Sequence, residues 1–248
     1  MRQRRSRSSA ALVALRGILF DLDDTLADSS GAEERVWGDV VERIAEFVPG
    51  VDRDELRRRY VDVLEGHYAE LSAGRIDFLT FRRRRLADAL SPWAEVSDDL
   101  FDRYSLAKAR IFDEIGPFPD AVAVLRTLRG AGIRVGVLTN GPSDIQRQKL
   151  RVSRLDEELD SIAISGELGF AKPDPEAYRL ALGLLGTRPD ETAMVGDSLE
   201  NDVLGGLTAG LAAVVWLPGV RRGDLPSGAH LARNLAEVPR LLGLELSV

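Results

Sequence analysis

The sequence lacks cysteine altogether and has only two histidines, His67 and His230, among 248 residues. The absence of cysteine excludes disulfide bonds, zinc–thiolate sites and a cysteine nucleophile. With so few histidines, any bound metal must depend mainly on carboxylate oxygens. No hydrophobic run approaches the roughly 20 residues that a membrane-spanning helix requires. We therefore expect no membrane partner.

The chain also lacks an overall excess of basic residues, since its net charge is -7 at pH 7. Proteins that bind a nucleic acid polymer usually carry a basic face, so no such partner is expected. Basic charge is concentrated near the start, where the first sixteen residues include five arginines and no acid. This composition predicts a flexible tail over residues 1–15 and a cytoplasmic protein. A twin-arginine or transit signal is the alternative.

The most informative stretch that is present covers residues 17–25, Gly-Ile-Leu-Phe-Asp-Leu-Asp-Asp-Thr. Its apolar part predicts a strand buried on both faces, as in a parallel sheet. Asp21 and Asp23 follow directly, at the sheet edge where open α/β folds bind ligands. Two close carboxylates repel each other unless a proton or cation separates them. Mg²⁺, which prefers oxygen ligands, is the expected cation, and a polar turn is the alternative explanation.

Residues 29–115 show helical periodicity and no clear strand. Helices are expected over residues 32–47, 52–71, 80–90 and 97–115. Such a composition predicts an inserted helical bundle with its own small core. Its two connections to the rest of the chain lie near residues 28–31 and 116–119.

From residue 120 onward, strand and helix patterns alternate. Strands are expected over residues 133–138, 161–165, 192–195 and 212–217, and helices over 120–129, 144–150, 175–185, 201–209 and 236–242. Repeated β-α units imply a parallel sheet with helices on both faces. The predicted fold class is therefore α/β, a doubly wound, Rossmann-like core formed by residues 16–28 and 116–248.

Two further strand ends carry groups suited to an anion. Thr139, Asn140 and Gly141 follow a buried strand, and their hydroxyl and amide groups can donate to a phosphate oxygen. An Asn-Gly turn is the alternative explanation. Lys172 lies just before a helix that Pro175 begins, and a lysine held there can neutralise a carboxylate and a phosphoryl group. A solvated surface lysine is the alternative.

The last strand end carries Asp197, with Asp202 five residues further on at the start of a helix. Either acid could face Asp21 and Asp23 across neighbouring strand ends and complete an oxygen cage for Mg²⁺. Capping of the helix by Ser198 or a neighbour is the alternative. That alternative leaves Asp197 unexplained.

In this order, the four segments resemble the four motifs of the haloacid dehalogenase-like (HAD) hydrolase superfamily, over residues 17–217. The motifs are Asp-x-Asp-x-Thr, a threonine, a lysine, and Gly-Asp with a second aspartate. The helical insertion corresponds to the C1-type cap of that family, a lid over the active site. The resemblance therefore implies a C1-capped phosphatase with a Rossmann-like core.

The resemblance also implies a role for each motif residue. Asp21 would attack phosphorus and become an aspartyl phosphate, and Asp23 would act first as general acid and then as general base. Thr139 and Lys172, with Asn140 and Gly141, would bind the phosphoryl oxygens. Mg²⁺ would be bound by Asp21, the Asp23 carbonyl and Asp197, with Asp202 in support, either as a direct ligand or one contact further out.

The expected function is Mg²⁺-dependent hydrolysis of a small phosphomonoester, such as a nucleotide or sugar phosphate, by a monomer or homodimer. A phosphomutase uses the same apparatus and is an alternative. A haloacid dehalogenase is a second alternative, although the family pattern for that chemistry lacks an acid at the position of Asp23. A non-catalytic binding protein on the same scaffold is a third.

Two features bear on the substrate. The loop over residues 139–143, with Gln146 and Lys149, is similar to the branch of pyrimidine 5'-nucleotidases and N-acetylneuraminate 9-phosphatases. In the helical insertion, the run of four arginines over residues 82–85 is interpreted mainly as a solvated face, because at most one or two of them can face a site. Trp37, Trp93 and His67 are interpreted as structural.

Overall fold

The first strand lies in the middle of a sheet because its residues are apolar on both faces. In the computed structural model, which describes residues 15–72, 75–219 and 224–244, β1 (Gly17–Phe20) is fully buried. It pairs in parallel with β2 (Arg134–Thr139) on one side and β4 (Thr192–Gly196) on the other. The predicted tail over residues 1–15 lies almost entirely outside the described residues.

The sheet has six strands in the order β3-β2-β1-β4-β5-β6, and every neighbouring pair is parallel. The outer strands are β3 (Ser161–Ile164), β5 (Ala213–Trp216) and β6 (Ala229–Leu231). The chain reverses the direction of winding between β3 and β4, on either side of β1, which is the arrangement of a doubly wound sheet. The predicted fold class is confirmed.

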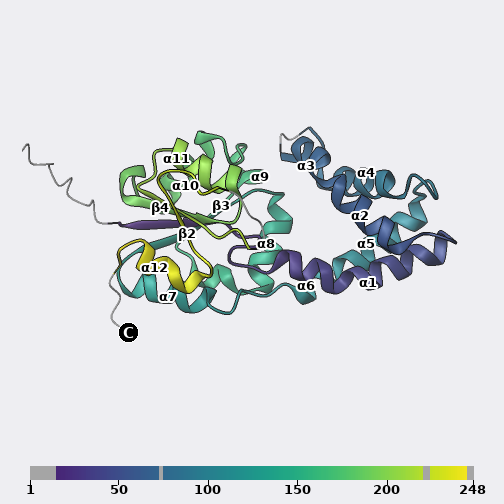
Figure 1. The fold of residues 1–248 in the computed structure, drawn as a ribbon, viewed down its shortest axis with the longest axis horizontal. Coiled ribbons are helices and arrows are strands. Elements are labelled where there is room, and N and C mark those ends of the chain that lie inside the picture. Colours follow the sequence, from purple (N-terminus) through teal and green to yellow (C-terminus); the bar gives the residue numbers. More distant parts are fainter. Residues whose placement is uncertain (1–14, 73–74, 220–223, 245–248) are drawn as a thin grey trace, which may run out of the picture.

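Alternate residues of β1 pack into two different cores. Ile18 and Phe20 lie in one core with α7 (Ala121–Gly130) and α12 (Val238–Leu241), whereas Leu19 lies in another with α10 (Pro175–Leu185). Figure 1 shows α7 and α12 on one face of the sheet, and α10 and α11 (Gly205–Thr208) on the other. Short helices α8 (Ser143–Val152) and α9 (Ser165–Leu168) follow β2 and β3.

The helical insertion forms a second lobe with its own core (Figure 1). Its helices are α1 (Ser29–Phe47), α2 (Arg53–Asp62), α3 (Leu64–Ser72), α4 (Phe78–Leu90), α5 (Asp98–Ala109) and α6 (Ile111–Glu114). Trp37 is buried in this core, and Trp93 packs against it, as predicted. Among the described residues, no helix combines the length and the apolar character needed to cross a membrane.

Three of the predicted helices are interrupted or begin irregularly. The helix expected over residues 52–71 breaks at Val63, where the nearby Tyr60 carbonyl accepts a hydrogen bond from Arg85. The helix expected over 97–115 is divided at Arg110. The helix expected over 201–209 begins as a wide π-type turn, Leu199–Leu204, in which the Asn201 carbonyl accepts a hydrogen bond from Tyr178. Inserted side chains of this kind interrupt the helical ladder.

The two connections between the lobes lie side by side. The Asp28 amide donates to the Gly116 carbonyl over 3.0 Å, and the Phe118 amide donates to the Leu26 carbonyl over 2.9 Å. Arg35 of α1 adds ion pairs to Asp28 at 2.9 Å and to Glu114 at 3.1 Å. Because the connections are bonded to each other, any change in the angle between the lobes would involve both together.

Candidate active site

The polar ends of three adjacent strands meet at one edge of the sheet. β2, β1 and β4 are neighbours, and their carboxyl ends carry Thr139, Asp21 and Asp197 respectively. The Asp21 amide donates to the Val195 carbonyl over 2.9 Å, which continues the β1–β4 ladder beyond the strand. This hydrogen bond fixes the backbone from which the Asp21 side chain projects, and the side chain is buried.

Three carboxylates from two segments could hold a metal ion. Asp21, Asp197 and Asp202 each offer a carboxylate oxygen, and these oxygens lie within 4.8 Å of one another. A donor set made only of oxygen fits a hard divalent cation such as Mg²⁺. Glycine at position 196 allows the Asp202 carboxylate to pack against the backbone there, because a Cβ at that position would collide with this carboxylate. The Asp23 carboxylate lies outside this cluster, so it would remain available for another task.

Lys172 joins two of these carboxylates. Its Nζ lies 2.5 Å from Asp21 Oδ1 and 2.6 Å from Asp202 Oδ1, and the side chain is almost completely buried. Burial lowers the pKa of Lys172, but the charges of Asp202 and Asp21 outweigh burial and hold this pKa above its usual value. The lysine is therefore charged, and among the described residues it is one buried cation shared by the two buried carboxylates of Asp21 and Asp202.

The Asp21 carboxylate shows the consequence of that imbalance. Burial raises the pKa of Asp21 well above its usual value. Lys172 opposes this effect, whereas the charges of Asp202, Asp23 and Asp197 add to it. A site with more buried negative than positive charge favours an additional cation, which is a second reason that these residues fit a divalent metal.

Asn140 and Gly141 both make hydrogen bonds within the protein. The Asn140 side chain makes two hydrogen bonds of 2.8 Å to the backbone of Lys172, one as donor and one as acceptor. The Gly141 amide donates to Ser165 Oγ over 2.9 Å. Gly141 thus links its loop to Ser165, and the Asn140 side chain fixes the loop that carries the lysine. Binding of a phosphate oxygen by these two residues stays a prediction.

Asp23 is held by a network that the sequence did not predict. Lys149 Nζ lies 2.5 Å from Asp23 Oδ1, Gln146 Nε2 donates to Oδ2 over 2.8 Å, and the Ser29 hydroxyl donates to the same carboxylate. Gln146 also donates to Thr139 Oγ1 over 2.6 Å. Burial raises the pKa of Asp23, but the charge and hydrogen bond of Lys149, with those of Ser29 and Gln146, lower it overall. Asp23 is consequently ionised in this arrangement.

A cavity of about 250 Å³ extends from Asp23 to the helical lobe. The core contributes side chains from α8 and the loop before it, and the lobe contributes mostly aromatic and basic side chains. The lining residues are Asp23, Glu33, Tyr60, Leu64, Tyr68, Leu71, Phe78, Phe81, Arg82, Arg85, Lys108, Ala109, Ile111, Phe112, Asn140, Gly141, Pro142, Ile145, Gln146 and Lys149. The cavity is placed to hold the part of a substrate that lies beyond its reacting group.

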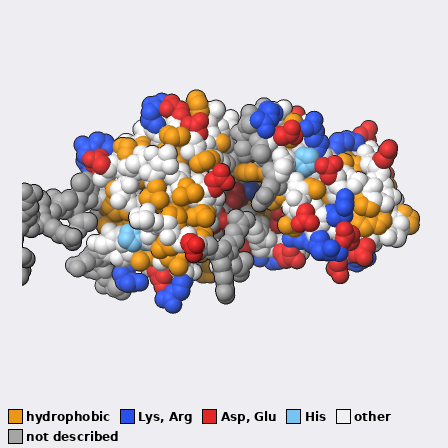
Figure 2. Space-filling view, turned by 45° about the horizontal axis from the view of Figure 1, so that its top comes forward, with side chains coloured by type: hydrophobic (Ala, Val, Ile, Leu, Met, Phe, Trp, Pro, Cys, Tyr) orange, Lys and Arg blue, Asp and Glu red, His pale blue; other side chains and the backbone are white. Residues whose placement is uncertain are grey.

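The arginine run of α4 divides between this cavity and the surface. Arg82 and Arg85 line the cavity, so their interpretation as a solvated face is wrong. Arg83 and Arg84 are about half exposed and form ion pairs with Asp98 and Glu70 respectively. The spacing from Phe78 could have indicated this division, because residues four and seven positions further on share its helical face. Figure 2 shows basic and acidic side chains next to one another over the visible face of the lobe.

Lys108 and Glu33 form a partly buried ion pair in the cavity wall, with 2.6 Å between Nζ and Oε1. Burial lowers the pKa of Lys108 to about 8, although Glu33 opposes the shift. Burial also raises the pKa of Glu33, but the charges of Lys108, Arg85 and Arg57 lower it overall. The sequence gave no indication of this pair, because its members come from α5 and α1, 75 positions apart.

This depressed pKa predicts a pH-dependent contribution to stability. Since an unfolded lysine has a pKa of about 10.4, the unfolded state binds more protons than the folded state at intermediate pH, and stability rises with pH. Relative to Lys108→Met, the free energy of unfolding of the wild type should rise by about 2 kcal/mol between about pH 7 and 9.5. Urea unfolding of both proteins measures this difference. Identical pH dependence of the two proteins would contradict the prediction.

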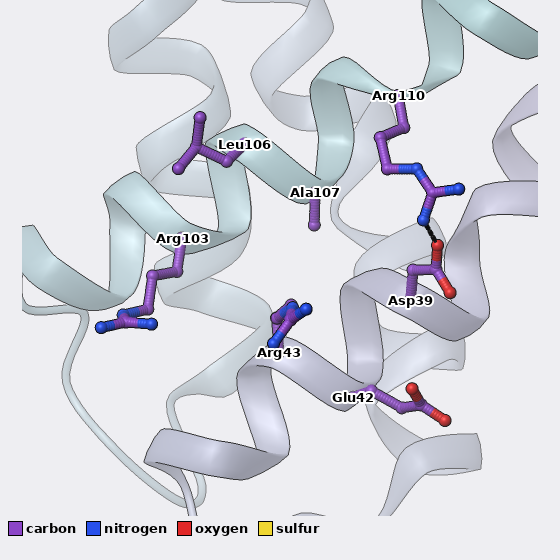
Figure 3. A pocket seen from close by; sticks show the side chains of 7 residues that line it. All are labelled: Asp39, Glu42, Arg43, Arg103, Leu106, Ala107 and Arg110. Carbon is purple, nitrogen blue, oxygen red and sulfur yellow. Dashed lines mark hydrogen bonds and ion pairs between the residues drawn. The ribbon is translucent and has the colours of Figure 1, made fainter.

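A second cavity, of about 470 Å³, lies between α1 and α5 and contains none of the strand-end acids. Its lining residues are Asp39, Glu42, Arg43, Arg103, Leu106, Ala107 and Arg110. Figure 3 shows Arg110 and Asp39 facing each other across it. Arg43 and Arg103 also have carboxylate partners within the lobe. Its three arginines are already paired with carboxylates, and its lining residues include none of the residues that meet at the sheet edge. We therefore do not assign the reaction to this cavity.

Known sequences that are similar to this chain include hydrolases that act on phosphate esters. Residues 15–210 match the family model of haloacid dehalogenase-like hydrolases. The chain is 29% identical to N-acylneuraminate-9-phosphatase of Rattus norvegicus over 93% of this chain and 95% of that protein. It is 30% identical to glyceraldehyde 3-phosphate phosphatase of Methanopyrus kandleri over 81% and 83%. It is 40% identical to pyrimidine 5'-nucleotidase YjjG of Escherichia coli over 51% and 56%.

Solved structures with the same fold include two similar hydrolases. The HAD-hydrolase YfnB of Bacillus subtilis, described as bound to magnesium, aligns with a TM-score of 0.74 at 24% identity, covering 92% of this chain and 99% of that one. At this identity the likeness shows the fold alone. A HAD phosphatase of Thermococcus onnurineus aligns with a TM-score of 0.67 at 27% identity, covering 94% and 100%.

Proposed function

The chain belongs to the haloacid dehalogenase-like hydrolase family, and on that basis we propose that it hydrolyses phosphomonoesters with Mg²⁺ through an aspartyl phosphate on Asp21. The family resemblance predicted from the sequence motifs is confirmed, and the enzyme is a phosphatase for small phosphorylated metabolites. The metal, the covalent intermediate and the residue roles are the proposal. The observation that carries it is the convergence of Asp21, Asp197, Asp202 and Lys172.

In the first step, Asp21 Oδ attacks phosphorus, the bond between phosphorus and the ester oxygen breaks, and the leaving alcohol takes a proton from Asp23. Before this step Asp23 must acquire that proton, and an alcohol that approaches it competes with Lys149 for the carboxylate. In the second step, water attacks phosphorus, Asp23 takes the proton of the water, and Asp21 leaves as a carboxylate. Using two steps lets one residue serve as acid and then as base.

The surrounding groups reduce the repulsion between a carboxylate and a phosphate dianion. Lys172, held against Asp21 at 2.5 Å, supplies a fixed positive charge. Thr139 is positioned by Gln146 at the neighbouring strand end, where its hydroxyl can face a phosphoryl oxygen. A bound Mg²⁺ would supply further positive charge to the phosphoryl oxygens.

The position of Asp23 favours phosphoryl transfer over dehalogenation. A halide leaves without a proton, so a hydrolytic dehalogenase has no use for an acid there. In this protein three side chains hold the Asp23 carboxylate at the mouth of the cavity. We propose that residues 29–115 act as the cap that closes over this site and selects the leaving group, which would exclude bulk water during the reaction.

Removal of the metal tests the proposal directly. Phosphate release from a panel of phosphomonoesters should stop in chelator and return on addition of Mg²⁺. Asp197→Asn should raise the Mg²⁺ concentration for half-maximal activity by about tenfold or more, because one charged ligand is lost. Asp190→Asn is the matched control, since Asp190 is exposed beside Arg188 before β4 begins. Full activity in chelator, or equal Mg²⁺ requirements of the two variants, would overturn the metal assignment.

A further inference from the structure

The cavity between the lobes carries more positive than negative charge. Among its lining residues that the structure describes, the charged ones are the cations Arg82, Arg85, Lys108 and Lys149 and the carboxylates Asp23 and Glu33. The excess of positive charge lies on the side of the helical lobe, away from Lys172 and the clustered aspartates. A ligand that fills this cavity therefore meets a basic surface beyond its reacting phosphate.

Three of these cations are already engaged. Lys149 is paired with Asp23 at 2.5 Å, and Lys108 is paired with Glu33 at 2.6 Å. Arg85 lies 3.9 Å from Glu33, donates to the Tyr60 carbonyl and stacks 3.7 Å from the centre of the Tyr60 ring. Each of these three side chains is thus fixed by partners within the protein.

Arg82 differs from the other three. Its Nη2 is buried and has no hydrogen-bond partner, and it forms no ion pair with any residue that the structure describes. Its guanidinium lies 5.1 Å from the ring centre of Tyr104 and 5.9 Å from that of Phe78, so aromatic rings hold it in place. A buried N–H of a cation without an acceptor is unfavourable, and an anionic acceptor would relieve this.

Most of the remaining cavity wall is aliphatic or aromatic, apart from Asn140 and Gln146, and the volume of the cavity bears on the size of the ligand. Aromatic and aliphatic side chains surround the basic groups, including Tyr68, Phe78, Phe81, Phe112 and Ile145. A cavity of about 150 Å³ can hold benzene, so 250 Å³ accommodates one ring or a short chain with one acidic group.

We propose that Arg82 determines specificity by binding an anionic group at the far end of the leaving group. The preferred substrates are then small phosphate esters whose alcohol part is itself an acid with a compact, apolar or aromatic body. This inference rests on the proposed function, because the phosphate must lie at Asp21 for the leaving group to reach Arg82. The anionic group is a carboxylate or a second phosphoryl group.

Matched aromatic esters test the inference. 4-Carboxyphenyl phosphate and 4-carbamoylphenyl phosphate have nearly the same shape but differ by one charge, and 1,4-phenylene bisphosphate carries a second phosphoryl group in the same place. We expect the wild type to prefer at least one anionic ester over the carbamoyl ester by about tenfold or more in kcat/KM. The preferred anionic ester identifies the source of the charge.

Variants of two arginines on α4 connect this preference to one side chain. Arg82→Gln should reduce the preference to about twofold or less, mainly through a lower kcat/KM for the anionic ester, and urea unfolding checks that the variant is folded. Arg82→Lys should keep part of the preference, because it retains the charge without the planar fork. Arg84→Gln should keep all of it, since Arg84 is half-exposed and paired with Glu70.

The outcomes distinguish a failure of the inference about Arg82 from a failure of the proposed phosphatase function. Equal kcat/KM of the wild type for charged and neutral esters, or a full preference in Arg82→Gln, would overturn the inference and leave the phosphatase function intact. No phosphate release from any of the three esters, or from the wider panel of phosphomonoesters, would overturn the proposed function and the inference with it.

Discussion

Asp21→Asn is expected to lower kcat for phosphate release by about 10⁴-fold or more, which is the largest effect predicted for this protein. The asparagine amide oxygen carries no full charge and cannot form the acyl phosphate that splits the reaction into two steps. Such a loss corresponds to a rise of about 5 kcal/mol or more in the activation barrier. Initial rates of phosphate release in saturating Mg²⁺ measure it.

The structure indicates that this substitution spares the fold. Asparagine has the shape of aspartate, and Lys172 keeps its ion pair with Asp202 at 2.6 Å. Asp24→Asn is the matched control, since Asp24 lies three positions further on and accepts hydrogen bonds from Ser30 outside the cluster. Its φ of 60° lies in the left-handed region, which asparagine tolerates.

A covalent readout adds to the kinetic one. After an acid quench during turnover, the wild-type peptide that contains Asp21 should carry one additional phosphoryl group, and the Asp21→Asn peptide should not. Phosphate release by Asp21→Asn at the wild-type rate would reject Asp21 as nucleophile. A phosphoryl group on a different residue would do the same.

The strand-end residues could be placed from the sequence because their signals are local. In each case an apolar run stops at a polar residue, and parallel strands bring their carboxyl ends to one edge. That reasoning placed Asp21, Thr139 and Asp197 at the ends of strands, and in the structure these strands are neighbours. It could not show that Asn140 is used to hold the Lys172 loop, because this depends on the separation between two loops.

The substrate cavity was largely hidden from the sequence, for two physical reasons. Its walls combine residues that are far apart in the chain, such as Lys149 and Asp23, separated by 126 positions. Its basic groups also depend on the rotation of α4, which begins at Phe78 after the N-cap Asp77, two residues earlier than predicted. A run of four arginines contains both inward and outward positions, and only tertiary packing selects them.

Lys172→Met should have the second-largest effect and should lower both activity and stability. Loss of the fixed charge beside Asp21 removes electrostatic stabilisation of the transferring phosphoryl group, so we expect kcat to fall by about 10³-fold. The same change leaves Asp21 and Asp202 buried without their shared cation. Breaking a buried pair in this way costs about 3–5 kcal/mol, which should appear as a lower free energy of unfolding in chelator.

Two controls, added Mg²⁺ and a variant of a second lysine, test whether these effects depend on the position of Lys172. A cation that binds the folded state alone stabilises it, so Mg²⁺ should restore part of the lost stability of Lys172→Met without restoring kcat. Lys149→Met provides the comparison, because Lys149 contacts the single carboxylate of Asp23 and is more exposed than Lys172. Its loss of stability should therefore be the smaller of the two. If Lys172→Met retained kcat within about tenfold of the wild type, or unfolded in chelator with the wild-type free energy, Lys172 could not be the cation that balances the buried carboxylates at this sheet edge.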